Sequence, residues 1–227
     1  MLSKLSNHFP RATVTFGKSF SAANVKKLSI IGAGQMGTGI GIVAAVTGKI
    51  EHVQMLDSTQ ASLEKSKVFL NGWLDKEIKK GRLTGADKTD VLSRISYADN
   101  LHAAKDSHFI IEAVNEDFAL KQKIFSTLDQ ITPPETILAS NTSSISITKI
   151  ASTTKRPSQV IGMHYFNPVP VMKGVELITA LQTSEATIQT TREYNFFLKL
   201  KNFPPSLGRG PNFWVPLIPP KKRIKFK

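Results

Sequence analysis

A glycine-rich loop near the amino terminus carries the first residues that could do chemistry. The run Gly32-Ala-Gly34-Gln35-Met36-Gly37 stands between a β-rich segment and a helical one. At this spacing Gly32 permits a tight turn, Gly34 lets the backbone approach a pyrophosphate, and Gly37 lets the helix pack closely on the strand. The helix then offers free N–H groups and a positive dipole end to the phosphates. The loop therefore predicts a dinucleotide site.

An acidic residue after the next strand indicates which dinucleotide would bind. Asp57 follows the strand-like run 52–56 and stands 25 residues after Gly32. A carboxylate at this place accepts hydrogen bonds from the adenosine ribose and repels a 2′-phosphate. The sequence therefore predicts NAD rather than NADP as the cofactor. The alternative is that Asp57, with Ser58, serves only to start the helix that follows.

Three further motifs lie in the second half of the chain. They read Glu112-Ala-Val-Asn-Glu116, Ala139-Ser-Asn-Thr-Ser143-Ser and Gly162-Met-His164-Tyr-Phe-Asn167-Pro-Val-Pro-Val-Met-Lys-Gly-Val-Glu176. Together they closely resemble the L-3-hydroxyacyl-CoA dehydrogenase family, and the resemblance runs from about Lys27 to about Tyr194. It implies an NAD-dependent oxidation of L-3-hydroxyacyl-CoA to 3-oxoacyl-CoA in fatty-acid β-oxidation.

The resemblance also implies a catalytic group of four residues. His164 matches the acid/base that takes the proton of the substrate 3-hydroxyl, a task that suits imidazole because it exchanges protons near neutral pH. Glu176 matches the acid that orients this imidazole and stabilises its charged form. Ser143 matches a serine that contacts the substrate hydroxyl and the cofactor. Asn167 matches an asparagine near the nicotinamide and the histidine.

Three more positions would contact the cofactor or the acyl-CoA substrate. Glu116 matches a contact to NAD, Lys121 a contact to CoA and the cofactor region, and Lys80 a lysine near the CoA phosphates. Simpler roles remain open for all of them. Glu116 and Ser143 could cap the helices that follow them, and the two lysines could be solvated helix residues.

Strands alternate with helices along the middle of the chain, where these residues must be positioned. We expect strands near 27–31, 52–56, 95–97, 109–114, 136–139, 160–165 and 175–179, and helices near 35–47, 58–80, 84–94, 117–131, 146–152 and 184–198. This alternation predicts an α/β fold, a Rossmann-like, doubly wound and mostly parallel sheet with flanking helices. The NAD-binding domain would span residues 27–198.

The net charge of +13 is confined to the two ends of the sequence. Residues 28–198 carry equal numbers of basic and acidic side chains, 17 of each. A nucleic-acid-binding domain would carry the excess on its folded part, so we expect no nucleic-acid partner. The chain has no cysteine, which excludes thiolate metal sites, and we expect no metal. No apolar run approaches the about 18 residues of a membrane span.

The two basic ends are expected to lie outside the domain. Residues 1–26 contain no acidic residue and are rich in serine, a composition typical of a mitochondrial presequence. They therefore predict that the protein is located in the mitochondrial matrix. The alternative is a basic leader that carries no targeting signal. Residues 199–227 are rich in proline, so we expect an irregular tail there. In the family resembled, a helical domain stands in this place and forms the homodimer, whose interface we expect to be lost. A non-catalytic, NAD-binding remnant is therefore the second hypothesis for function.

Overall fold

The computed structural model describes residues 25–172 and 174–207. The strands are β1 (Lys27–Ile31), β2 (His52–Leu56), β3 (Ile95–Ala98), β4 (Phe109–Glu112), β5 (Ile137–Ser140), β6 (Val160–Tyr165), β7 (Gly174–Thr179) and β8 (Lys201–Leu207). The helices are α1 (Gln35–Ile42), α2 (Gln60–Lys79), α3 (Gly85–Arg94), α4 (Phe118–Ile131), α5 (Ile147–Ala151) and α6 (Glu185–Phe197). A π-helical turn, η2 (Val43–Thr47), extends α1, and η3 (Leu101–Ala104) and η4 (Pro157–Gln159) are short 3-10 turns.

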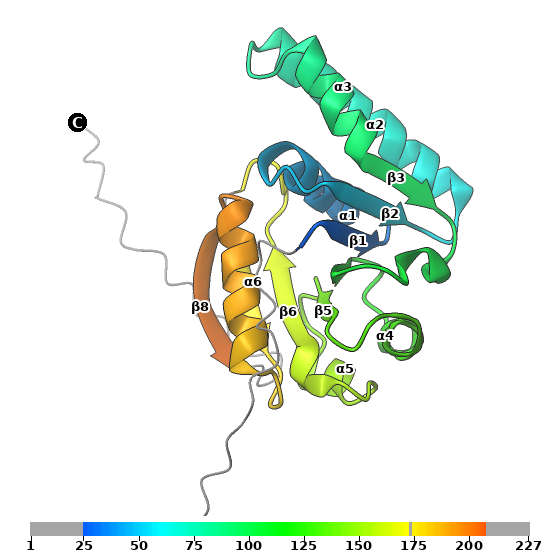
Figure 1. Ribbon diagram of the computed structural model, residues 1–227, viewed down its shortest axis with the longest axis vertical. Coiled ribbons are helices and arrows are strands. Elements are labelled where there is room, and N and C mark those ends of the chain that lie inside the picture. Colours follow the sequence, from blue (N-terminus) through cyan, green and yellow to red (C-terminus); the bar gives the residue numbers. More distant parts are fainter. Residues whose placement is uncertain (1–24, 173, 208–227) are drawn as a thin grey trace, which may run out of the picture.

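The eight strands form one sheet in the order β3-β2-β1-β4-β5-β6-β7-β8 (Figure 1). All neighbouring strands are parallel except β6 and β7, which are antiparallel. The chain first winds outward from β1 to β3, then crosses to β4 and winds in the opposite direction. This confirms the predicted Rossmann-like, doubly wound and mostly parallel sheet.

Helices cover both faces of the sheet. Ile40 of α1, Leu70 of α2 and Tyr194 of α6 are buried against one face, while Phe125 of α4 and Ile147 of α5 are buried against the other. Strands buried on both sides explain the unbroken apolar runs of the sequence, because successive side chains of a strand point to opposite faces. The carboxyl ends of the parallel strands then carry the loops that could form a site.

Polar side chains fix where several helices begin. Thr84 forms a capping box with Asp87 at the start of α3, and Ser184 accepts a hydrogen bond from the Thr187 amide at the start of α6. Such caps satisfy N–H groups that have no partner within the helix. The helix starts are therefore encoded locally.

The helices α2 and α3 form a hairpin that projects from the edge of the sheet beyond β3 (Figure 1). Leu74 of α2 and Val91 of α3 are buried, and the Lys88 ammonium lies 2.6 Å from the Asp75 carboxylate. Among the described residues no helix is both long and apolar enough to cross a membrane.

The segment after α6 corrects the predicted domain boundary. An irregular tail from residue 199 is wrong for residues 201–207, which form β8, parallel to β7 at the edge of the sheet. Pro204 and Pro205 lack an N–H donor, and an edge strand tolerates this because it needs ladder hydrogen bonds on one side only. The rest of the proline-rich segment, 208–227, and residues 1–24 of the basic leader lie outside the described residues.

Candidate active site

The glycine loop lies between β1 and α1, where the strand order reverses. Gly32 has a φ of +104°, a conformation that favours glycine, and its amide donates to the Leu56 carbonyl at 2.7 Å. A Cβ on Gly37 would collide with the Gly32 carbonyl oxygen. Both glycines are therefore required by the close packing of the turn.

Gly34 differs from these two because it borders open space. A Cβ at this position would meet no heavy atom within 4 Å. Gly34 is also the N-cap of α1, and no side chain caps the helix there. Open space beside uncapped N–H groups at a positive dipole end suits a pyrophosphate. The residues present thus fit the phosphates of a dinucleotide.

Asp57 braces the loop from the end of β2. Its Oδ2 accepts a hydrogen bond from the Ala33 amide at 2.9 Å, and its Oδ1 accepts from the amide and the hydroxyl of Thr59 at 3.0 and 2.6 Å. Burial raises the pKa of Asp57, but the hydrogen bonds from Thr59 and Ala33 outweigh burial and lower it overall. Thr59, not Ser58, is the N-cap of α2. Asp57 therefore supports the start of α2 and lies against the glycine loop at once.

One carboxylate organises the loop that follows β5. Glu116 Oε1 accepts hydrogen bonds from the amides of Ser143 and Ser144 at 2.7 and 3.0 Å. It also accepts from the hydroxyls of Thr142, Ser143 and Ser144 at 2.5, 3.1 and 3.1 Å. Burial raises the pKa of Glu116, but these bonds and the charge of Lys121 outweigh it and lower the pKa to about 2. Ser143, which is exposed, is thereby held at the rim of the site.

The simple capping roles proposed for Glu116 and Ser143 are wrong. Asp117 caps α4 by accepting a hydrogen bond from the Leu120 amide at 2.7 Å. Ser146 caps α5 by accepting from the Lys149 amide at 3.4 Å. The bond between Glu116 and the Ser143 loop therefore serves something other than the start of a helix.

Lys121 lies beneath this loop rather than at the surface. Its side chain is 1% exposed, and its ammonium lies 2.5 Å from Glu112 and 3.3 Å from Glu116. The expectation that Lys121 contacts CoA or the cofactor directly, or is solvated, is therefore wrong in this structure. Glu112, missed as a site residue, is fully buried and accepts from the Ser140 hydroxyl at 2.6 Å. The sequence feature that could have revealed Glu112 is a carboxylate at the end of an otherwise apolar strand, because a buried charge needs a buried partner.

The strands β6 and β7 place a histidine opposite a carboxylate. His164 and Glu176 are register partners in the antiparallel ladder, and His164 Nδ1 lies 2.9 Å from Glu176 Oε2. The side chains are 17% and 35% exposed, so the pair can be reached from solvent. When Nδ1 donates to Glu176, Nε2 becomes the nitrogen that can accept a proton. The pair thus has the geometry of a carboxylate-oriented base.

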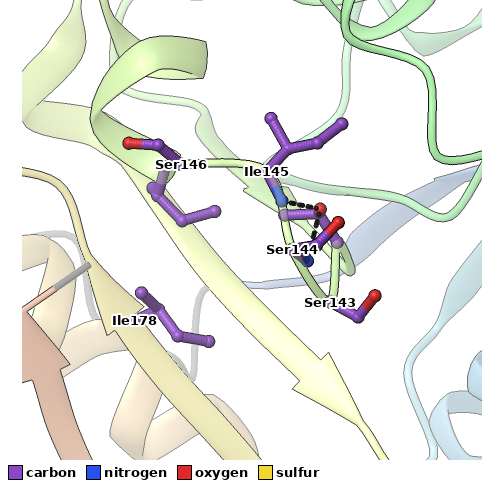
Figure 2. Close-up of a pocket in the computed structure, with 7 residues that line it drawn as sticks. Ser143, Ser144, Ile145, Ser146 and Ile178 are labelled. Atoms are coloured by element: carbon purple, nitrogen blue, oxygen red, sulfur yellow. Dashed lines mark hydrogen bonds between the residues drawn. The ribbon is translucent and has the colours of Figure 1, made fainter. Parts of the chain in front are cut away.

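A pocket opens on the same face of the sheet as this pair. It is lined by Thr142, Ser143, Ser144, Ile145, Ser146, Ile147 and Ile178 (Figure 2). Ile178 lies two residues after Glu176 on β7, and its register partner Gly162 lies two residues before His164 on β6. Side chains two residues apart on a strand share a face. The pocket therefore lies between the Ser143 loop and the strand pair that carries His164 and Glu176.

The remaining predicted residues are partly brought together. The Gln35 amide donates to Asn167 Oδ1 at 3.1 Å, which joins the glycine loop to the segment after β6. Met36 packs against the core. Lys80 has no described contact with this group: it is the C-cap of α2, and its ammonium lies 3.2 Å from the Glu77 carboxylate.

Comparison with known proteins identifies the domain that holds this site. Residues 27–202 match the family described as 3-hydroxyacyl-CoA dehydrogenase, NAD binding domain. The chain belongs to this family. The match confirms the resemblance seen in the motifs, and it confirms NAD as the cofactor of this dehydrogenase domain.

Individual relatives agree with the family match. The dehydrogenase domain is 47% identical over 163 residues to a probable 3-hydroxybutyryl-CoA dehydrogenase of Bacillus subtilis, which covers 72% of this chain and 56% of that protein. It is 42% identical over 189 residues to a 3-hydroxybutyryl-CoA dehydrogenase of Clostridioides difficile, covering 83% and 66%. The crystal structure of an (S)-3-hydroxybutyryl-CoA dehydrogenase from Ralstonia eutropha superimposes with a TM-score of 0.78 at 40% identity, covering 82% and 64%. The chain thus spans between 56% and 66% of these relatives' lengths.

Two glycines of the loop should separate folding from cofactor binding. Gly34→Ala adds a methyl group to open space, so the melting temperature should change little while NADH affinity falls about 10-fold or more, because the methyl group takes the place of a phosphate. Gly37→Ala should instead lower the melting temperature strongly, because its methyl group meets the backbone of Gly32. Thermal unfolding and NADH fluorescence titration measure both effects. Unchanged NADH affinity in Gly34→Ala would contradict the assignment of the phosphate position.

The low pKa of Glu116 predicts a defined dependence of stability on pH. Glu116→Gln should lower the unfolding free energy at pH 7 by about 1 kcal/mol, discounted for a side chain that is 35% exposed. The folded pKa of about 2 lies below the ordinary 4.5, so this stabilisation is present above pH 4.5 and is lost as pH falls toward 2. Urea unfolding of both proteins between these pH values should show the difference shrinking. A constant difference would show that the carboxylate charge is not responsible.

Proposed function

We propose that this chain is an NAD-dependent L-3-hydroxyacyl-CoA dehydrogenase that forms 3-oxoacyl-CoA in fatty-acid β-oxidation. The observation that carries the proposal is the pair of His164 and Glu176, 2.9 Å apart on the face that also holds the Ser143 loop. The activity of the relatives belongs to proteins of which this chain spans only part, so turnover itself belongs to the proposal.

The chemistry follows from the positions of these side chains. Bound at the glycine loop, NAD would supply the acceptor for the hydride that leaves C3 of the substrate. His164 Nε2 takes the proton of the 3-hydroxyl in the same step, and Glu176 orients the ring and stabilises the imidazolium. The Ser143 hydroxyl donates to Glu116 at 3.1 Å, so it would donate to the substrate oxygen by turning its O–H away from Glu116, while the bond from the Ser143 amide to Glu116 still holds the loop. Asn167 accepts a hydrogen bond from Gln35 of the glycine loop, and we propose that it lies beside the nicotinamide when the cofactor is bound.

The CoA part of the substrate would be bound by fewer residues than the sequence implied. Lys80 is half exposed at the end of α2, and it is the lysine that we propose to contact the CoA phosphates. Lys121 is excluded from this role by its burial beneath Glu116.

The proposal places the reaction in the mitochondrial matrix on the strength of residues 1–26 alone. The relatives named above are bacterial, so they give no support to an organelle. A reporter fused to residues 1–26 should enter isolated, energised mitochondria, and replacing the leader's Lys4, Arg11 and Lys18 by Gln should prevent import, since the positive charge responds to the membrane potential. Import that persists without these charges would contradict the proposal.

Acetoacetyl-CoA-dependent oxidation of NADH, followed at 340 nm, tests the catalytic pair. His164→Gln and Glu176→Gln should each lower kcat, by about 10²- to 10⁴-fold for the histidine, with NADH affinity changed less than about twofold. The double variant should lose little beyond His164→Gln, because residues that act as a unit are non-additive.

His52→Gln is the matched control, because His52 is exposed at the start of β2. The kcat of this variant should equal that of the unaltered chain. Independent, multiplying losses in the double variant would show that the pair is not coupled. NADH binding without any turnover by the unaltered chain would favour the second hypothesis, an NAD-binding remnant.

A further inference from the structure

We infer that Glu112 is a positioning residue: it acts through Lys121 and Glu116 to fix the loop that presents Ser143. The inference rests on the proposed function in one respect, namely that the loop presents Ser143 to the substrate and the cofactor. The contacts that support it are independent of any substrate.

The chain of contacts begins at a fully buried carboxyl group. Glu112 and Ser140 are register partners at the carboxyl ends of β4 and β5. Glu112 Oε2 accepts from the Ser140 hydroxyl at 2.6 Å, and Oε1 accepts from the Val114 amide at 2.8 Å. The Glu112 carboxyl group is therefore held in place by a residue of β5 and by a residue just after β4. Its position is fixed by the sheet.

Lys121 links Glu112 to Glu116, because its ammonium forms an ion pair with both carboxylates. Its ammonium, on the first turns of α4, lies 2.5 Å from Glu112 Oε1 and 3.3 Å from Glu116 Oε2. The side chain is 1% exposed, so solvent offers its ammonium no alternative partner. A buried ammonium needs such partners to offset its lost hydration. Glu112 and Glu116 are thus held at a set separation.

The two carboxylate oxygens of Glu116 contact different partners: one faces Lys121, and the other accepts hydrogen bonds from the loop that carries Ser143. Oε2 faces Lys121, while Oε1 accepts every hydrogen bond from Thr142, Ser143 and Ser144 described above. Because the Glu116 side chain is partly exposed, it could turn toward solvent without the ammonium beside it. The amide and hydroxyl of Ser143 would then lose their shared acceptor. The presentation of Ser143 therefore depends on an ion pair buried below it.

A second buried ion pair on the same helix provides a matched control. Asp129 of α4 lies 2.8 Å from Arg156, and both side chains are nearly buried. This pair ties α4 to the segment after α5, and the Lys155 amide also donates to Asp129 at 2.9 Å. Neither residue contacts Glu116 or the Ser143 loop in any described hydrogen bond or ion pair.

The test compares Glu112→Gln/Lys121→Met with Asp129→Asn/Arg156→Met in the full chain. Removing both partners leaves no unpaired buried charge, so each variant can fold. Amide exchange at Ser143 and Ser144, measured by NMR, should be about 10-fold faster in the first variant, and NADH should bind about 3- to 10-fold more weakly. The control should show neither change at a comparable melting temperature. Exchange rates and affinity equal to those of the control would overturn the inference.

Two features keep this result separate from the proposed function. If no form of the chain binds NADH, the proposed function fails, while amide exchange at Ser143 and Ser144 still decides the positioning role. If the double variant does not fold, Glu112→Gln alone keeps the side chain's size and weakens its hold on Lys121. Its Ser143 and Ser144 amides should still exchange faster than those of Asp129→Asn, and equal rates would overturn the inference.

Discussion

The ammonium of Lys121, buried between two carboxyl groups, is the interaction on which the site's geometry depends. An ammonium removed from water is costly unless charged and hydrogen-bonding partners surround it. Glu112 meets this need from the sheet and Glu116 from the loop before α4. The solvation requirement of one lysine therefore sets the position of Glu116. Through it, the requirement also sets the loop that carries Ser143.

Asp57 applies the same physical logic at the other half of the site. Like Glu116, it follows a strand of the parallel sheet and accepts backbone N–H groups from a loop. Both carboxylates have a lowered pKa although burial opposes it, because hydrogen bonds to the charged form outweigh desolvation. Two fixed negative charges thus brace the loops at both sides of the reversal in strand order. The position of these loops is where a doubly wound sheet binds a dinucleotide.

Much of this arrangement follows from the sequence, and the exceptions have physical reasons. The glycine loop was predictable because its turn tolerates only glycine at Gly32 and Gly37. The burial of Lys121 was missed, although Lys121, Ile124, Phe125 and Leu128 share one face of α4 at helical spacing. A lysine on an apolar face is ordinarily solvated at its tip, and only the folded positions of Glu112 and Glu116 reverse that expectation. The strand β8 was missed because proline excludes a central strand but not an edge strand.

The single antiparallel pair in the sheet explains why the catalytic candidates lie so close in sequence. A parallel return from β6 would need a crossover of a dozen residues or more, usually with a helix. The antiparallel return uses only residues 166–173, and the ladder then sets His164 directly opposite Glu176. Asn167 lies in the same short connection and reaches Gln35 of the glycine loop. One reversal of strand direction therefore places the proposed base, its carboxylate and a contact to the cofactor loop within a single stretch of chain.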